Sequence, residues 1–407
     1  MVKAGWDKET VAIYELLFFA AHLLSFAWST GVNNALLAYY PTLGDERKGV
    51  MIFNAALLML FISVVITSIF LFFREPIMGL LTDNADLPYT SWIAIFLMCS
   101  PAAILVQSIY LLREEPRKIT FNTHVIFILQ LIVVAVAILI FGTVKALVIG
   151  VVLWSIFKFM WLISMLIKYA TPSFDSTLFK TFGLFSIPLI LQFVLSNGME
   201  YVDGIIVNQY FDAKEFPVFR YGSKELPITV ILVVSLTSAM IPLAVNNLGE
   251  TLTEIKVRTK KLMHILFPLS AVLILISPII YRLVYSDEYI ASAQLFNVYL
   301  LILSTRILLP QVVMYANQRN GALLWMTIIE LLVNVGLSIW WAQSMGLVGI
   351  AYATVVANIC HSGMMILYNK YSLKVDSSRY IPWKSYGLYL MLLFGSYMAS
   401  TQIHNYG

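Results

Sequence analysis

The chain has few charged residues and lacks the long polar segments of a soluble protein. Only 12% of its 407 residues are Asp, Glu, Lys or Arg, whereas 60% are hydrophobic, and the mean hydropathy is +0.84. A soluble domain with this composition could not cover its own core with polar surface. The composition therefore predicts a chain that lies mostly in lipid.

The chain also lacks the residues of several kinds of site. Its two cysteines, Cys99 and Cys360, lie in apolar segments and predict neither a disulfide framework nor a zinc site. The sequence contains no Walker loop, no GxGxxG and no HExxH, and its polar loops are short. A net charge of +4 does not indicate nucleic-acid binding. We therefore expect no enzyme activity, no bound cofactor, no metal site and no nucleic-acid partner.

Long apolar stretches recur along the whole chain. A stretch of about 20 apolar residues crosses a bilayer as a helix, because a helix satisfies its backbone groups internally. We predict an all-α, multi-pass membrane protein with about twelve transmembrane helices. The predicted ranges are 11–40, 51–73, 91–112, 122–142, 146–167, 181–210, 226–247, 262–284, 292–316, 322–343, 346–368 and 385–402.

The loops between these segments alternate in basic charge, which predicts their sides of the membrane. The richer set, predicted to be cytoplasmic, contains Arg47, Lys48, Arg113, Arg117, Lys118, Lys168, Lys180, Lys256, Arg258, Lys260, Lys261, Arg319, Lys370, Lys374, Arg379 and Lys384. The other set is half as large and includes both termini: Lys3, Lys8, Arg74, Lys145, Lys214, Arg220, Lys224 and Arg282. Residues 1–10 do not resemble a signal peptide, since no apolar core with a cleavage site follows them.

Two weak internal matches indicate a duplicated bundle. The segment that starts at Thr30 resembles the one at Thr237, and the segment at Gly142 resembles the one at Gly346. The members of both pairs are separated by nearly the same number of residues and have the same predicted sidedness. This pattern favours two parallel repeats, a known construction of transporters.

Several segments resemble the polysaccharide and oligosaccharide-lipid flippases of the MATE/MOP exporter superfamily. Asp203 occupies the family's acidic position near the end of a helix, and IPLAV at 241–245 resembles the end of the next helix. The other similar segments are 199–227, 285–301, 317–321, 330–334 and 346–358. These motifs specify a fold and a broad activity, and they do not specify a substrate.

The resemblance implies two pseudo-symmetric helical bundles around a central cavity. We expect an N-terminal lobe of five helices at 1–170, a C-terminal lobe of six helices at 171–370 and one further helix at 371–407. Family members usually begin with one more helix, so the family's first helix is expected to be missing here. That helix normally lines the cavity.

The resemblance also implies a function. We expect a flippase of the bacterial inner membrane that moves undecaprenyl-pyrophosphate-linked oligosaccharides for surface polysaccharides such as O-antigen and lipopolysaccharide, by alternating access. Expected partners are membrane lipids, the lipid-linked glycan, and polysaccharide polymerases and glycosyltransferases. A multidrug or ion antiporter of the same superfamily and a peptidoglycan-precursor flippase remain alternatives. A membrane-embedded glycosyltransferase or acyltransferase is a further alternative, and it would need clustered acidic or His residues.

Ionisable residues inside predicted spans are candidate sites, because charge in hydrocarbon is costly. Arg306 and Glu330 lie on neighbouring predicted helices. Arg306 could attract a lipid pyrophosphate in a hydrated cavity, or the two residues could form a structural ion pair. Lys158 could be a second cationic contact, or its amine could reach the cytoplasmic interface.

Four residues near the predicted outer face form a candidate gate. Glu200 and Asp203 are three residues apart and share one helical face, and Arg220 and Lys224 follow in the next loop. Their ion pairs could open and close, and protonation or sodium binding at Asp203 could couple transport to H⁺ or Na⁺. Alternatively, the two acidic residues mark a solvated helix end.

Neutral polar residues in the spans complete the candidate set. Asn334, Asn358 and His361 would suit sugar hydroxyls in a cavity. Hydrogen bonds between helices explain the same residues equally well.

Overall fold

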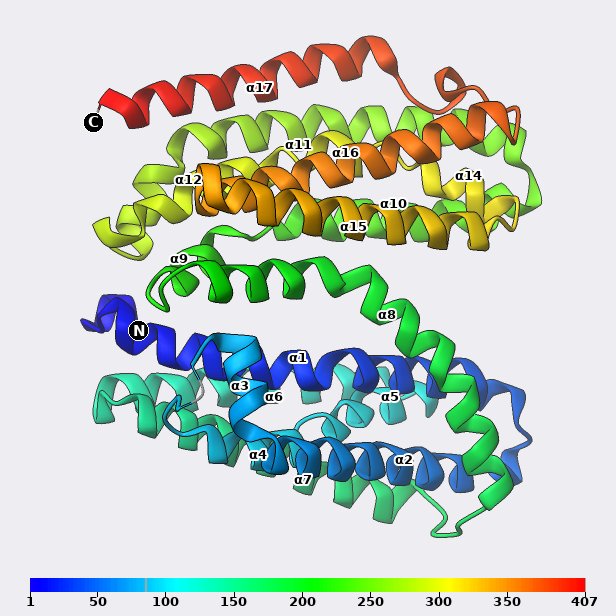
Figure 1. Cartoon of the computed structure of the whole chain (residues 1–407). Coiled ribbons are helices and arrows are strands. Elements are labelled where there is room, and N and C mark those ends of the chain that lie inside the picture. Colours follow the sequence, from blue (N-terminus) through cyan, green and yellow to red (C-terminus); the bar gives the residue numbers. More distant parts are fainter. Residues whose placement is uncertain (85, 407) are drawn as a thin grey trace. The chain divides into compact units, whose positions relative to one another are not determined.

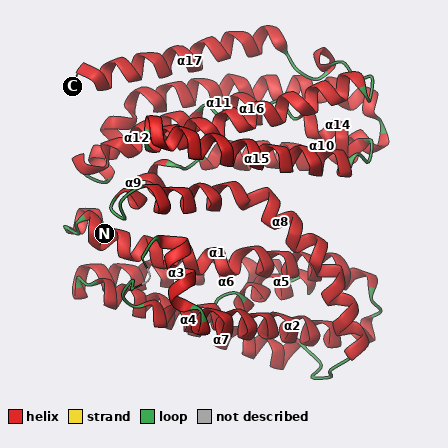
Figure 2. Ribbon diagram, in the orientation of Figure 1, coloured by secondary structure: helices red, strands yellow, loops and turns green. Residues whose placement is uncertain are grey.

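The described chain is built from helices. The structure, a computed structural model, describes residues 1–84 and 86–406, without the side chains of 196, 197 and 403–406. Within these residues every regular element is a helix and no strand occurs (Figures 1 and 2). This confirms the predicted all-α fold class.

Seventeen α-helices are labelled in chain order, and Figure 1 shows most of them. The first eight are α1 (Lys8–Tyr39), α2 (Asp45–Phe72), α3 (Arg74–Thr82), α4 (Thr90–Cys99), α5 (Leu105–Leu112), α6 (Pro116–Val136), α7 (Val144–Tyr169) and α8 (Ser176–Tyr210). The others are α9 (Glu215–Gly222), α10 (Pro227–Asn246), α11 (Leu248–Val284), α12 (Ile290–Leu300), α13 (Leu303–Arg306), α14 (Pro310–Ala316), α15 (Asn320–Met345), α16 (Leu347–Tyr371) and α17 (Trp383–Tyr406).

All twelve predicted segments coincide with a helix or a broken helix. Among the described residues, ten helices are long and apolar enough to cross a membrane, or eleven if the bent segment from Asp287 to Ala316 is one span. The remaining predicted segment is α17. The helix α11 begins well before its predicted start at 262, because its first turns carry charged residues that hydropathy does not recognise. Asn247 caps it by accepting a hydrogen bond from the Glu250 N–H at 3.3 Å.

The chain divides into two compact units. The first contains Met1–Tyr201 and Phe211–Pro217, and the second contains Val202–Tyr210 and Val218–Gly407. The division lies within α8, whereas the predicted lobe boundary at 170 placed the whole of this helix in the second lobe. The predicted separate segment 371–407 belongs to the second unit, in which α17 lies along α11 (Figure 1).

A close helix crossing explains why the first part of α8 belongs to the first unit. A Cβ atom added at Gly31 of α1 would lie 2.6 Å from the Cα atom of Ile190 in α8. Small residues let helix backbones approach in this way, and van der Waals packing is the main attraction between helices in lipid. Phe182 of α8 is also buried, in the same core cluster as Leu36 and Met59 of α1 and α2. The lobe boundary predicted at residue 170, in the loop after α7, missed this packing.

A buried amide fixes the loop between α7 and α8. Asn54 of α2 donates from Nδ2 to the carbonyls of Val50 at 2.8 Å and Ser173 at 2.9 Å, and Oδ1 accepts from the Asp175 N–H at 3.2 Å. Its exposed fraction is 0%. Asn54 therefore satisfies loop groups that a helix ladder cannot reach.

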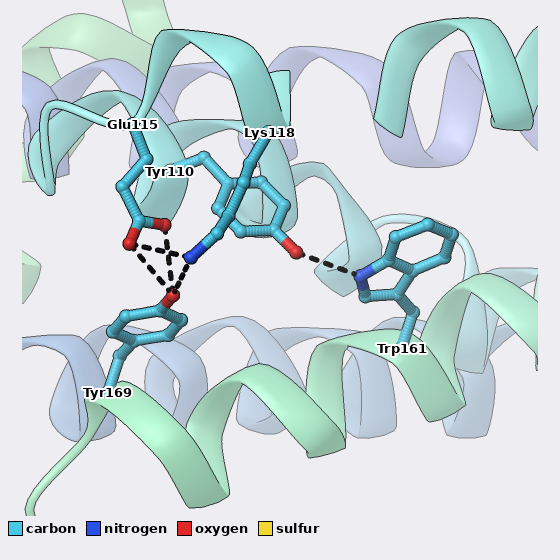
Figure 3. A network of polar contacts seen from close by, with 5 residues as sticks. All are labelled: Tyr110, Glu115, Lys118, Trp161 and Tyr169. Carbon is cyan, nitrogen blue, oxygen red and sulfur yellow. Dashed lines mark hydrogen bonds and ion pairs between the residues drawn. The ribbon is translucent and has the colours of Figure 1, made fainter. Parts of the chain in front are cut away.

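A second polar network joins the start of α6 to the end of α7 (Figure 3). The Tyr169 hydroxyl donates to Glu115 Oε2 at 2.9 Å, and Lys118 lies 2.7 Å from Glu115 Oε1. The ammonium of Lys118, with the Tyr169 hydroxyl, holds the pKa of the Glu115 carboxyl below its ordinary value. Arg113 donates to the Tyr169 carbonyl at 2.9 Å. Two of the basic loops therefore lie at the same end of this unit, as the predicted alternation requires; their side of the membrane stays a prediction.

In the second unit α15 and α16 form a tight antiparallel pair. Gly346, with φ of +68°, makes the turn between them, and a Cβ atom at Gly349 would lie 2.3 Å from the Trp341 carbonyl oxygen. Only glycine fits such an approach. The pair positions the polar residues described below.

Two buried asparagines of the first unit should respond oppositely to replacement by leucine. Asn54→Leu leaves the Ser173 carbonyl and the Asp175 N–H without partners, so we expect a loss of about 1–3 kcal/mol of stability. Among the described residues, neither amide atom of the fully buried Asn122 has a hydrogen-bond partner. Asn122→Leu should therefore be neutral or stabilising. The thermal unfolding midpoints of the purified variants in one detergent measure both effects, and equal losses would contradict the assignment.

Candidate functional site

The helix α15 turns its polar residues inward. Its buried residues are Glu330, Asn334, Ser338 and Ala342, each four positions after the last and therefore on one face. Large apolar residues such as Leu332 and Trp340 are exposed. This pattern is the reverse of a soluble amphipathic helix and suits a helix whose outer face meets lipid.

Asp203 of α8 is the centre of a buried cluster in the second unit. Its exposed fraction is 1%. Ser338 of α15 donates to Asp203 Oδ1 at 3.2 Å, and Thr354 of α16 donates to Oδ2 at 2.8 Å. Asn334 Nδ2 donates to the Thr354 hydroxyl at 3.1 Å. Three helices thus contribute to one carboxylate site, which we name the Asp203 cluster (Asp203, Asn334, Ser338 and Thr354).

The Asp203 cluster corrects one interpretation of the sequence. A solvated helix end would expose Asp203, but burial and two hydroxyl donors enclose it. Glu200, three residues earlier, is exposed and belongs to the first unit. Arg220 lies in α9 and Lys224 in the loop that follows it. The gate proposed for these four residues stays a prediction.

Glu330 and Arg306 do not pair with each other. Glu330 Oε2 lies 2.7 Å from Nδ1 of His361 on α16, and Arg306 bonds instead to Glu225, ahead of α10. The structural ion pair considered for Arg306 and Glu330 is therefore wrong. The helix face of each residue decided the pairing, and adjacency of two helices in sequence does not reveal that face.

Arg306 lies at a break in a transmembrane segment. The segment Asp287–Arg306 is bent by 43° from Pro310–Ala316, and Leu309 at the break has a φ of +53°. Proline at 310 cannot donate to the helix ladder, so carbonyls near the break lack helical partners. Tyr386 of α17 donates to the Ser304 carbonyl at 2.7 Å, and Asn369 of α16 donates to the Pro310 carbonyl at 3.0 Å.

Lys158 lies beside a corresponding break in the first unit. The helices α4 and α5 are separated at Ser100 and Pro101, and Lys158 of α7 is hydrogen-bonded to the Ser100 hydroxyl at 3.4 Å. The Lys158 side chain is half-buried. Each unit therefore has a basic residue at a broken helical segment. Lys158 lies beside the break between α4 and α5 in the first unit, and Arg306 lies at the break of α12–α14 in the second.

The remaining neutral candidate has a local role. Asn358 Nδ2 donates to the Thr354 carbonyl at 3.0 Å, four residues earlier in α16. Sequence reasoning missed Ser338, Thr354 and Glu225, because hydroxyls are common in transmembrane helices and Glu225 lies outside the spans. The four-residue spacing of Ser338 from Asn334 is the one pattern that could have indicated part of this site. Within the described residues no group of three or more His, Cys, Asp or Glu side chains could hold a metal ion.

Several solved structures share this fold. The lipid II flippase MurJ in an inward closed conformation aligns with a TM-score of 0.75 at 20% identity, covering 97% of this chain and 86% of that one. An inward-facing multidrug resistance MATE transporter of the MOP superfamily gives 0.69 at 14% identity, covering 91% and 92%. The Vibrio cholerae MATE transporter VcmN, as a mutant, gives 0.57 at 14% identity, covering 90% and 87%. At these identities the likenesses show a shared fold, and they do not identify a substrate.

The family comparison covers most of the chain. No curated protein sequence matches this chain. The family described as "Polysaccharide biosynthesis protein" matches residues 13–294. The chain belongs to this family.

Removing the hydroxyl donors of the Asp203 cluster should destabilise the second unit. In the double variant Ser338→Ala with Thr354→Val, the buried Asp203 loses both donors described above, which should lower stability by about 1–3 kcal/mol for each lost bond. Thr327→Val is the matched control, since among the described residues the Thr327 hydroxyl bonds the Leu323 carbonyl of its own helix alone, at 3.0 Å. The unfolding midpoint in detergent measures the difference. Equal midpoints for the control and the double variant would show that the donors do not hold Asp203.

Proposed function

We propose that this member of the polysaccharide biosynthesis family is a flippase for polyprenyl-pyrophosphate-linked oligosaccharides in the bacterial inner membrane, and that it acts by alternating access. Family membership and the transporter fold support movement of a lipid-linked or polar substrate across a membrane. The physical task is to carry a polar glycan and a pyrophosphate through hydrocarbon while the polyprenyl tail stays in lipid. We propose that undecaprenyl carriers for O-antigen or lipopolysaccharide are the substrates.

The observation that carries this proposal is Arg306 at the break of α12–α14. A guanidinium has five N–H donors in a planar fork that matches phosphate oxygens. Glu225 accepts from one terminal nitrogen, and in the described part of the chain the buried Nε of Arg306 has no hydrogen-bond partner. Arg306 therefore keeps donors for an anionic group, and Glu225 sets the orientation of its side chain.

Lys158 supports the same proposal from the first unit. Among the described residues its ammonium bonds to the Ser100 hydroxyl, at 3.4 Å, and a Ser hydroxyl does not neutralise an ammonium. A compact, mobile ammonium can follow a phosphate as it moves. A drug exporter would favour acidic and aromatic pockets for cationic drugs, so the two basic residues favour an anionic substrate. A peptidoglycan-precursor flippase would also carry a pyrophosphate, and the experiment below separates it.

Partners follow from the proposed substrate. We propose that the chain works beside glycosyltransferases, which assemble the glycan on its lipid, and beside a polymerase, which uses it after transport. In this proposal the chain itself makes and breaks no covalent bond.

Complementation should depend on the charge of Arg306. In a strain that lacks its polysaccharide flippase, the chain should restore surface glycan, and Arg306→Ala should lower it at least about tenfold, because the loss of a phosphate contact of ~1.4 kcal/mol changes an equilibrium tenfold. Arg282→Ala is the matched control, since Arg282 is exposed and pairs with Asp287 at 2.5 Å. Membrane levels of each variant are measured by immunoblot.

A further variant separates substrate binding from a structural ion pair. Glu225→Gln removes the partner of Arg306 and leaves its charge. If Arg306 serves only to pair with Glu225, both variants lose surface glycan alike, and the proposal fails. Rescue of a peptidoglycan-precursor flippase deletion, without rescue of any surface-glycan strain, would instead assign the precursor substrate.

We also propose that the Asp203 cluster binds the coupling cation, Na⁺ or H⁺. Sodium is a hard cation that prefers oxygen ligands, and the cluster offers a carboxylate, two hydroxyls and the Asn334 Oδ1, which has no partner among the described residues. One carboxylate balances one monovalent charge in a buried site. A proton on Asp203 would have the same neutralising effect.

Sodium should stabilise the chain through Asp203. The unfolding midpoint of the purified protein should rise in NaCl relative to choline chloride at equal ionic strength, because a ligand at 100 times its Kd adds about 2.7 kcal/mol. Asp203→Asn should abolish the rise, whereas Asp83→Asn, at an exposed helix end, should keep it. If NaCl has no effect but the midpoint changes with pH only when Asp203 is present, the proton is the coupling ion. No dependence on either ion would exclude coupling at this cluster.

A further inference from the structure

A second polar site lies in the second unit, away from the residues assigned above. A cavity of about 170 Å³ is lined by Gln294 and Asn297 of α12, Tyr352 of α16, and Tyr397, Ser400 and Thr401 of α17. A cavity of about 150 Å³ can hold one benzene molecule, so this cavity has room for one small ring. Six of its seven lining residues have polar side chains, and the seventh is Val348.

The lining carries hydrogen-bond capacity that the protein itself does not use. Asn297 is 2% exposed, and its Nδ2 donates to the Ile274 carbonyl at 3.1 Å, but within the described residues its Oδ1 has no partner. The hydroxyls of Tyr352 and Tyr397 are 2.5 Å apart. Only one hydroxyl proton lies between them, so the other remains available. A buried acceptor without a partner costs about 1–3 kcal/mol, which a bound donor would recover.

The chemistry of the lining defines the occupant. The six residues named above have amide and hydroxyl groups, and none is an Asp, Glu, Lys, Arg or His. Such a site provides donors and acceptors without a charge to balance, which suits a neutral, hydroxyl-rich molecule. The two tyrosine rings add faces on which the C–H groups of a sugar ring can pack.

The position of the cavity favours a head group at a membrane surface. Gln294 is near the start of α12, Tyr352 near the start of α16 and Thr401 near the end of α17, at the end predicted to be extracytoplasmic. Gln294 is exposed, so the cavity can be reached. We propose that this cavity binds one neutral sugar ring, either as the head group of a glycolipid or as a free sugar. This inference does not depend on the flippase proposal.

Native mass spectrometry of the purified full chain tests the site. The probes are glucosyl diacylglycerol, diacylglycerol with the same acyl chains, and methyl glucoside as a free competitor. We expect one glucosyl diacylglycerol to be retained and diacylglycerol to be lost. Tyr352→Phe, which keeps the ring, and Asn297→Leu should each weaken retention about tenfold, the effect of one hydrogen bond of ~1.4 kcal/mol. Tyr371→Phe is the control, since Tyr371 is 66% exposed at the other end of α16.

The outcomes separate the two sources and can overturn the proposal. Displacement by methyl glucoside shows that the sugar ring alone is recognised, and retention without displacement shows that the lipid head group is required. Equal retention of diacylglycerol, or unchanged retention in both Tyr352→Phe and Asn297→Leu, overturns the proposal and leaves a water-filled cavity. Unfolding midpoints confirm that the variants are folded; because Tyr352→Phe removes one oxygen atom only, it keeps the test valid if Asn297→Leu is unstable.

Discussion

The rest of the structure depends on the cost of leaving a polar group without a partner in hydrocarbon. Each unsatisfied backbone group in lipid costs several kcal/mol, so transmembrane segments are helices unless other groups repair them. The break before Pro310 shows the repair directly, because Tyr386 supplies a donor to the carbonyl of Ser304, near the end of the preceding helical segment. One side chain of α17 therefore satisfies a carbonyl group of the bent segment.

The same constraint organises the charged side chains. Asp203 bonds to Ser338 and Thr354, Glu330 bonds to His361, and Arg306 bonds to Glu225. In each case the partner lies on another element. Breaking such a contact leaves a charge in a medium of low dielectric, which is costly, and a ligand that replaces a partner must supply equivalent bonds.

Hydropathy predicted the helices well and the contacts poorly, for one physical reason. The length and apolarity of a span are set by the bilayer, so α2 or α7 could be recognised from its own residues. Which face of a helix meets which neighbour is set by packing of the whole unit. Thus only Glu330 and Asn334 were recognised on the buried face of α15, and the partner of Arg306 was misassigned. The predicted boundary before α8 missed the close crossing of Gly31 with Ile190.

The helix α16 separates two kinds of chemistry in the second unit. Thr354 contacts the Asp203 carboxylate, whereas Tyr352, two residues earlier, lines the neutral cavity beside α17. Successive residues of an α-helix are about 100° apart, so these two side chains point about 200° apart, to nearly opposite faces. A cation at one face and a sugar at the other would therefore act on one rigid helix without touching each other. Energetic coupling between the sites would require α16 to have two positions, each favoured differently by the two ligands.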